Sequence, residues 1–472
     1  MRIKTMTSKA WNKRAQDILV LSRAGVDLCS NFWSGLVLGV FPAIFILTAV
    51  LILAYYVSAF YPGYLTPDSI YILSQGLGDK PISNWHPPFV TVAWGVLYGV
   101  FKGTGGIWVF QVALFILAAN FFVTGLKNKV IAFFFLCFIL LYAPIFTNMA
   151  ALWKDDFSVV FTLFCAGFAI RAIRLRSQSH AHMAGLFFVL ASLTRIDYFI
   201  VAMPIAFGAA LSCRDDGCRP KWHGRKGLHI FAFYVLLLVI GSQLMGGVVQ
   251  KRLNPWETTA IWDIGGVMNN SEVKGYVPGY RCDTSDPLIF GDHRLFAINL
   301  PEEAEINDGV NEAKLIRQAW VNAIISHPAA YLKHRLCIAK KFFGIDKSIY
   351  YPYPSAVFLK SRYAQNAERS ALNIDLYWFY DSHANGLMFR YYFYLVACFL
   401  IFVAACLMRK IDFFQFSLFA SICMSAARFV VLPAADFRYG LWMVVGTLLM
   451  AAVFIDYLID MIGGARKSNF PS

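Results

Sequence analysis

The first membrane-length run of the chain, Leu36 to Ser69, reads LVLGVFPAIFILTAVLILAYYVSAFYPGYLTPDS. Its apolar part is long enough to cross a bilayer as a helix, which takes about 20 residues. The polar motif Tyr61 to Ser69 follows directly and carries the carboxylate of Asp68 where that helix would leave the membrane. A run this long that begins this late does not fit a cleaved signal peptide, so we expect it to be retained as a span.

The composition indicates a polytopic membrane protein built from helices. Hydrophobic residues make up 58% of the 472 residues and charged residues only 15%, and the apolar residues come in blocks near the length of a bilayer span. A soluble helical protein would show shorter blocks with a polar stripe at helical spacing. We therefore predict an all-α fold with about ten transmembrane helices.

The formal net charge of +14 comes from basic residues beside the apolar runs, which indicates contact with a membrane rather than with a nucleic acid. Lysine and arginine gather next to apolar runs, which is typical of cytoplasmic loops and of segments drawn to anionic lipid heads. The clusters are Arg2 to Arg23, Lys127 with Lys129, Arg171 to Arg176, Arg214 to Lys226, and Arg409 with Lys410. Membrane lipids are therefore expected as partners, and nucleic acid is not.

Placing every basic cluster in the cytoplasm gives a topology with both termini inside. The predicted spans are 36–59, 107–124, 130–148, 157–174, 183–195, 198–212, 228–248, 391–408, 413–432 and 439–459. The run 89–100 is too short to cross comfortably, and as a span it would send the later basic clusters outward. We therefore predict an interfacial helix there. The two short spans around Arg195 and Asp197 are predicted as a hairpin with those charges at the outer surface.

This topology puts scattered charged residues on the outer side, where ionisable groups near membrane depth are costly and usually functional. They are Asp68, His86, Lys154, Asp155, Asp156, Arg195, Asp197, Asp436 and Arg438. The predicted domains are an N-terminal membrane module over 1–248, a mixed outer (periplasmic) domain over 249–390, and C-terminal membrane helices over 391–472. Cys282 and Cys337 could form a disulfide in an oxidising compartment, although their spacing does not show one.

Five motifs together resemble one class of enzyme. They are Tyr61 to Tyr64 with Asp68, His86-Pro87-Pro88 before a helix, Lys154-Asp155-Asp156 at the start of a span, Leu193 to Asp197, and Asp436 to Tyr439. In this pattern the chain resembles the GT-C-fold integral membrane glycosyltransferases, which include protein O-mannosyltransferases, aminoarabinose transferases and serotype-converting O-antigen glucosyltransferases. It departs from them where Asp68 is followed by Ser69 rather than a second acid, and where His86 replaces the lysine of aminoarabinose transferases.

The resemblance implies an inverting transfer of a sugar from a polyprenyl-phosphate donor to an envelope glycan, such as O-antigen or lipopolysaccharide, outside a bacterial inner membrane. Asp68 would take the proton of the acceptor hydroxyl as general base. The charges of Lys154, Arg195 and Arg438, with His86, would stabilise the departing lipid phosphate. Asp155 and Asp156 would either hold Mg²⁺ or Mn²⁺ against that phosphate or orient Lys154.

Contacts to the acceptor are expected from Tyr64, Trp262 and His327. The charged motifs also have structural interpretations. Asp68 could be an N-cap for the helix after Pro67, the motif 154–156 could be a solvated helix start, and Arg195 with Asp197 could be a local ion pair.

Two other functions compete with the glycosyltransferase interpretation. An O-antigen ligase or polymerase also combines many spans with a large outer loop, but depends on arginines and a histidine in that late loop. A transporter or flippase for lipid-linked glycans would show interrupted helices, repeats and charges near the bilayer midplane. The charges of this chain gather at one surface and favour the enzyme.

Overall fold

The computed structural model describes residues 41–212, 224–271, 280–282, 309–346, 363, 370–408, 411–432 and 434–468. The chain divides into two units, 1–51 and 52–472, and in the first unit the described residues belong to the helix Phe41–Phe60. The N-terminal basic cluster and most of the basic loop before α10 lie outside the described residues, as do Arg409 and Lys410.

Six helices in the described ranges are long and apolar enough to cross a membrane, against the ten spans predicted. They are Phe41–Phe60, α4 (Thr104–Val123), α7 (Lys154–Leu175), α10 (Gly224–Gly246), α18 (Phe413–Ala427) continued by η3 (Arg428–Val430), and η4 (Phe437–Gly440) continued by α19 (Leu441–Ser468). Shorter helices occupy the other predicted spans, namely α5 (Lys129–Leu141), α8 (Gln178–Thr194), α9 (Tyr198–Leu211) and α17 (Tyr391–Leu407). Every predicted span therefore corresponds to helix, but four are shorter than a typical bilayer span of about 20 residues.

The predicted span 130–148 is divided rather than continuous. α5 ends before Tyr142, whose backbone is extended, and the short helix α6 (Ala143–Asn148) then begins. Pro144 explains the division. In the first turn of α6 the N–H that proline lacks would have no helical partner, so its absence costs nothing. If α5 instead continued as one helix through Pro144, the proline would remove a backbone hydrogen bond.

α7 is the central helix of the membrane region. It packs against α4, α8 and α9. In its apolar stretch of 18 residues, 78% of the residues are buried, compared with 11% in the corresponding stretch of α10. An apolar helix that is exposed to this extent is suited to face lipid, whereas α7 is surrounded by protein. The acidic start of α7 is therefore held inside the fold.

Two charge clusters mark the opposite ends of the last span. At one end Asp456 of α19 accepts from Arg174 at 3.1 Å, and the nearby Asp460 pairs with Lys127 at 2.5 Å. Arg438 lies in η4 at the other end. The 18 helical steps from Arg438 to Asp456 correspond to roughly 27 Å of helix, close to the thickness of a bilayer core. Lys127 and Arg174, from two of the predicted inner basic clusters, thus contact the far end of this span from Arg438, about one membrane thickness away.

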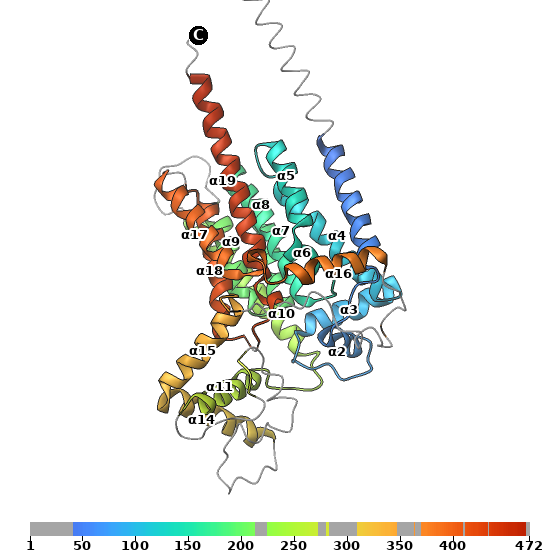
Figure 1. Ribbon diagram of the computed structural model, residues 1–472, viewed down its shortest axis with the longest axis vertical. Coiled ribbons are helices and arrows are strands. Elements are labelled where there is room, and N and C mark those ends of the chain that lie inside the picture. The colour runs from blue at the N-terminus through green and yellow to red at the C-terminus, as the bar shows by residue number, and fades with distance from the viewer. Residues whose placement is uncertain are drawn as a thin grey trace, which may run out of the picture. The chain divides into compact units, whose positions relative to one another are not determined.

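The first outer loop and the start of the long outer segment lie together. Figure 1 shows α2 (Pro67–Gly76) and α3 (Pro88–Phe101) toward the same end of the long helices as α11 (Trp256–Asn270), α14 (Gly309–Ser326) and α15 (Pro328–Phe342). The backbone N–H groups of Gln250 and Lys251 donate to the carbonyl of Ile82 at 2.8 and 3.0 Å. This arrangement agrees with the predicted topology, which put both segments on one side.

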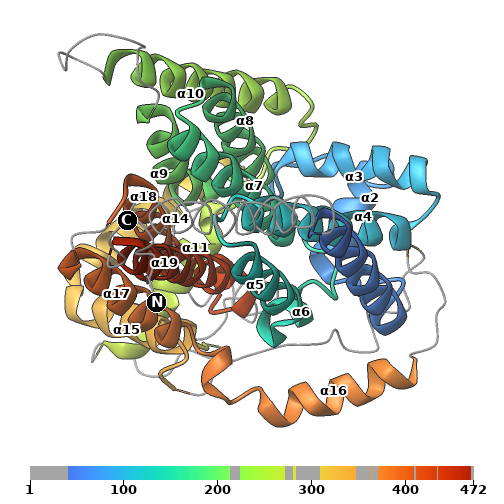
Figure 2. The same cartoon turned by 90° about the horizontal axis from the view of Figure 1, so that it is seen from above.

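The predicted short helix at 89–100 is confirmed as α3, which has 14 residues and proline in its first turn. Figure 2, taken along the long helices, shows α3 and α16 (Ala371–His383) side-on, so both run across the bundle. That direction is the one expected of a helix lying in a membrane surface.

The described part of the outer domain is helical. α11, α14 and α15 pack around a small apolar core made by Ala260, Ile261, Trp262, Ile316 and Ile338. A disulfide joins Cys282 to Cys337 of α15, a pairing that the spacing of the cysteines had left open.

Candidate active site

Asp68 lies in the first turn of α2 but does not cap it. The cap is Thr66, whose side chain accepts from the N–H of Ser69 at 3.2 Å, while the hydroxyl of Ser69 accepts from the N–H of Thr66 at 3.2 Å. This reciprocal capping box satisfies the helix start without the acid. The N-cap interpretation of Asp68 is therefore wrong, and its carboxylate is available for other contacts.

Backbone pairing places the first outer loop beside the start of α7. The N–H of Tyr64 donates to Ala150 at 2.9 Å, and the N–H of Leu152 donates back to Tyr64 at 2.8 Å. The hydroxyl of Ser69 also donates to the carbonyl of Leu152 at 2.5 Å. Asp68 and the motif that begins at 154 are thereby brought together, although they are far apart in sequence.

The turn before this pairing requires glycine. Gly63 has φ of +84°, and a Cβ built on it would lie 2.3 Å from Cγ of Trp108. Trp108 is fully buried and donates from its indole to the carbonyl of Met149 at 2.8 Å. A side chain at 63 would strain the backbone and displace this tryptophan, which holds the chain just before α7.

Arg438 joins Asp68 to the end of the chain. One Nη donates to Asp68 at 2.8 Å, and Nε lies 2.9 Å from Asp436. The guanidinium also lies over the rings of Trp153 and Tyr439, 5.1 and 5.0 Å from their centroids. Two carboxylates and two aromatic faces therefore hold one arginine, which favours the charged guanidinium at that position.

His86 and Lys154 complete the surroundings of Asp68. Lys154 Nζ donates to Nδ1 of His86 at 2.5 Å, and Nε2 of His86 lies 3.9 Å from Asp68. Burial, and next the charge of Lys154, hold the pKa of His86 well below its usual value, while Asp68 acts in the opposite direction. The imidazole is thus neutral, with the lysine contact placing its remaining proton on the nitrogen nearer Asp68.

The same neighbours set the ionisation of Asp68. Burial alone would raise its pKa, but the charge of Arg438, followed by that of Lys154, holds that pKa well below the usual range. Its side chain is still 30% exposed, compared with 4% for His86 and 13% for Arg438. Asp68 is an ionised carboxylate at the rim of a cationic site.

A second set of charges lies behind Arg438. Arg195 pairs with both Asp155 and Asp197, the latter at 2.6 Å, and its guanidinium lies 4.4 Å from the ring centroid of Tyr439. Asp197 also accepts from Arg428 at 2.8 Å. The predicted Arg195–Asp197 ion pair is confirmed, but it belongs to a larger network that includes the start of α7.

Asp155 and Asp156 are not a solvated helix start. Their exposed fractions are 1% and 0%, and Asp156 accepts from Nε2 of Gln111 at 3.2 Å. Among the described residues no three His, Cys, Asp or Glu side chains gather as a metal-binding group. Asp155 is paired with Arg195 and Asp156 accepts from an amide, and neither contact is to another oxygen ligand of the kind that Mg²⁺ prefers.

The expected acceptor contacts do not converge with the charged residues. Trp262 is fully buried in the outer-domain core and donates from its indole to Arg281 at 2.7 Å. His327 precedes α15 in the same domain. Tyr64 does lie in the first outer loop, but its ring is buried and its hydroxyl accepts from Asn373 of α16.

Sequence reasoning missed three contributors to the site. Arg428 has 0% exposure and lies within the predicted span 413–432, where an isolated charge in an apolar run was the available signal. Gln111 was hidden in the same way inside the span 107–124. Trp153, which lies under Arg438, was not distinguishable from an ordinary interfacial aromatic.

Comparisons with known proteins give only a distant likeness. No family model matches the chain, and neither does any curated protein. Among solved structures it is similar to the archaeal oligosaccharyltransferase AglB from Archaeoglobus fulgidus in complex with an inhibitory peptide and a dolichol-phosphate, with 12% identity, a TM-score of 0.44, and coverage of 93% of this chain and 52% of that one. The apo form of the Archaeoglobus fulgidus oligosaccharyltransferase gives 12% identity, a TM-score of 0.41, and coverage of 90% and 51%. This chain spans about half the length of those structures.

Proposed function

We propose that the protein is a membrane glycosyltransferase that moves a sugar from a polyprenyl-phosphate donor to a hydroxyl of an envelope glycan, such as O-antigen or lipopolysaccharide, at the outer face of a bacterial inner membrane. One observation carries the proposal. The accessible carboxylate of Asp68 lies 2.8 Å from Arg438 and beside the His86–Lys154 pair. A base and phosphate-binding cations are thus side by side, as transfer from a sugar phosphate requires.

The reaction follows from these positions. The acceptor oxygen attacks the anomeric carbon on the face opposite the phosphate, and its proton passes to Asp68. The bond between that carbon and the phosphate oxygen breaks with its electron pair, so the lipid phosphate leaves with one more negative charge. Attack from the opposite face inverts the anomeric configuration. Arg438 and Lys154 would stabilise this developing charge by ionic hydrogen bonds.

Binding of the donor would also strengthen the base. In the free enzyme Arg438 and Lys154 hold the pKa of Asp68 low, which makes it a weak proton acceptor. A donor phosphate that draws contacts from these two cations weakens their effect on Asp68, and the pKa of the carboxylate then rises. The proton acceptor therefore becomes effective when the donor is in place.

The remaining charged residues support these groups. His86 is neutral and accepts from Lys154, so it orients the ammonium without adding to the repulsion among the cations. Arg195 is held between Asp155 and Asp197 and stacks on Tyr439. Because Asp155 contacts Arg195 and Asp156 contacts Gln111, we favour an orienting role for them over a Mg²⁺ or Mn²⁺ site, and no step depends on a metal.

The side of the membrane is supported by the disulfide. Cys282 and Cys337 are joined in the segment that pairs with the first outer loop, and disulfides persist in oxidising compartments such as the periplasm. A lipid-linked donor presented at that surface would meet Asp68 at the edge of the bilayer.

The test uses detergent-solubilised protein with a panel of polyprenyl-phosphate hexoses. We expect one donor to be consumed, either by slow hydrolysis or, with envelope glycan present, by transfer of the hexose. Consumption should stop in Arg438→Ala. If wild-type protein binds a lipid-linked sugar, moves it across vesicles and never cleaves it, the protein is a transporter and the proposal fails.

A further inference from the structure

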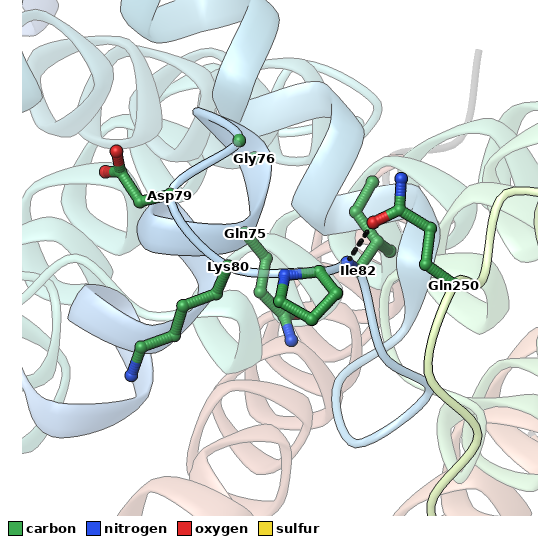
Figure 3. Close-up of a pocket in the computed structure, with 8 residues that line it drawn as sticks. Gln75, Gly76, Asp79, Lys80, Ile82 and Gln250 are labelled. Carbon is green, nitrogen blue, oxygen red and sulfur yellow. Dashed lines mark hydrogen bonds between the residues drawn. The ribbon is translucent and has the colours of Figure 1, made fainter.

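A polar cavity lies at the opposite end of α2 from Asp68. It has a volume of about 380 Å³ and is lined by Gln75, Gly76, Gly78, Asp79, Lys80, Pro81, Ile82 and Gln250. Figure 3 shows that these residues come from the end of α2, the loop that follows it, and the segment after α10. None of them belongs to the charged site described above.

The cavity is held by contacts between distant segments. The side-chain oxygen of Gln250 accepts from the N–H of Ile82 at 3.1 Å, the interaction drawn in Figure 3. Below it, Asn84 and Leu253 exchange two hydrogen bonds at 2.8 and 2.6 Å. Because both walls are tied together, the cavity is a formed feature of the fold rather than a gap beside a loose loop.

Its lining suits hydroxyl groups. Gln75 is 2% exposed, and its amide nitrogen donates to Ser83 at 2.8 Å, but its oxygen has no hydrogen-bond partner. A buried acceptor without a partner is unfavourable unless a ligand or water donates to it. Gln250, Asp79 and Lys80 also line the cavity. The cavity therefore has both donor and acceptor side chains, and sugar hydroxyls are able to act as both.

The cavity is also connected to the catalytic end of α2. Lys80 lies over the ring of Tyr71 at 5.2 Å, and Tyr71 packs edge-on against His86 at 5.6 Å. The eight helical steps from Asp68 to Gly76 correspond to roughly 12 Å along the helix, farther than one sugar ring reaches. A ligand that occupies the cavity and the site at once has to be an oligosaccharide.

We infer that this cavity is a subsite for the acceptor glycan, which binds a sugar residue behind the one whose hydroxyl reaches Asp68. The inference rests on the proposed function and adds the location and minimum length of its acceptor. It predicts that the protein recognises acceptors of two or more sugar residues and binds single sugars much more weakly.

The experiment measures binding, so it is independent of turnover. Wild-type protein is applied to an array of bacterial envelope oligosaccharides from one to four residues, and the best ligand is then titrated against Lys80→Ala and Gln250→Ala. Both positions are exposed. Lys251→Ala removes an equally exposed lysine next to Gln250 that does not line the cavity, and is the matched control.

We expect both cavity variants to bind the oligosaccharide at least about tenfold more weakly, as for loss of a hydrogen bond to a charged or well-placed group, with the control unchanged. The inference is overturned if no oligosaccharide binds better than its single sugars, or if both variants bind like wild type. Absence of donor cleavage by wild type is a separate result, which would contradict the proposed function instead.

Discussion

Replacing Asp68 by asparagine tests the central chemical step with little disturbance of the fold. The variant keeps the size of the side chain and removes its negative charge. Arg438 would keep Asp436 at 2.9 Å and its positions over Trp153 and Tyr439. Since the Asp68 side chain is 30% exposed, the lost ion pair should cost no more than about 1 kcal/mol of stability.

The catalytic cost should be much larger. Loss of a placed general base lowers turnover by about 10²–10⁴-fold, which corresponds to roughly 3–5 kcal/mol in the activation barrier. The rate of hexose transfer from polyprenyl phosphate in solubilised membranes measures this directly, with protein level followed in parallel. Asp375→Asn, at an exposed carboxylate of α16, is the control and should transfer normally. Transfer by Asp68→Asn at a rate near wild type would remove Asp68 from the mechanism.

Three further outcomes are expected, two from contacts of the charged site and one from the outer domain. Lys154→Ala should weaken donor binding by roughly 1.5–3 kcal/mol. Excess chelator should leave sugar transfer by the wild-type protein intact. Loss of transfer in chelator that Mg²⁺ restores would show that a metal is required. Because the pKa values of Asp68 and His86 both lie below their usual 3.8 and 6.5, both groups keep one protonation state above pH 6.5. The pH profile of kcat/KM should therefore show no acid limb there, and a limb that moves in His86→Gln would contradict this assignment. In the outer domain, the buried carboxylate of Asp263 accepts from the buried Arg335 at 2.6 Å. Asp263→Asn should therefore destabilise that domain by roughly 3–5 kcal/mol, because it leaves Arg335 without its carboxylate; an unchanged Tm would contradict this.

The membrane architecture was predictable because its signal is local. Apolar length and the position of basic residues identified helices such as α4, α7 and α19, and Pro87-Pro88 marked the start of α3. Breaks within a helix were harder to predict from the sequence. Pro144 divides one predicted span, but a proline near the end of an apolar run is also compatible with a kinked continuous helix.

The site was predictable in part. Asp68, His86, Lys154, Arg195 and Arg438 were all identified as outer charges, and the structure brings them together. What the sequence could not give was the pairing among them. Whether Arg195 meets Asp155 or only Asp197 depends on how α7 and the hairpin pack, and that packing is a tertiary property.

Buried polar residues were missed or misread for a related reason. Arg428 and Gln111 lie within apolar runs. The length of such a run is enough to predict a membrane span, and a single polar residue changes that prediction little. Trp262, in contrast, was predicted to be functional but is part of a core. An aromatic beside an acid in an outer segment suggests sugar contact, but the same pattern arises when tryptophan fills a small core and aspartate anchors its neighbours, as Asp263 does here.

The backbone pairing between Tyr64 and the residues just before α7 has a consequence for how the protein could diversify. It ties Asp68, the proposed general base, and Lys154 to one frame by backbone hydrogen bonds between Tyr64 and residues 150–152, none of which lies in the segment 256–342 that holds α11, α14 and α15. New acceptor preferences could therefore arise by exchange of that segment while the transfer chemistry stays in place. Chimaeras that graft an outer segment from another protein of this architecture should retain donor cleavage even where they lose their original acceptor.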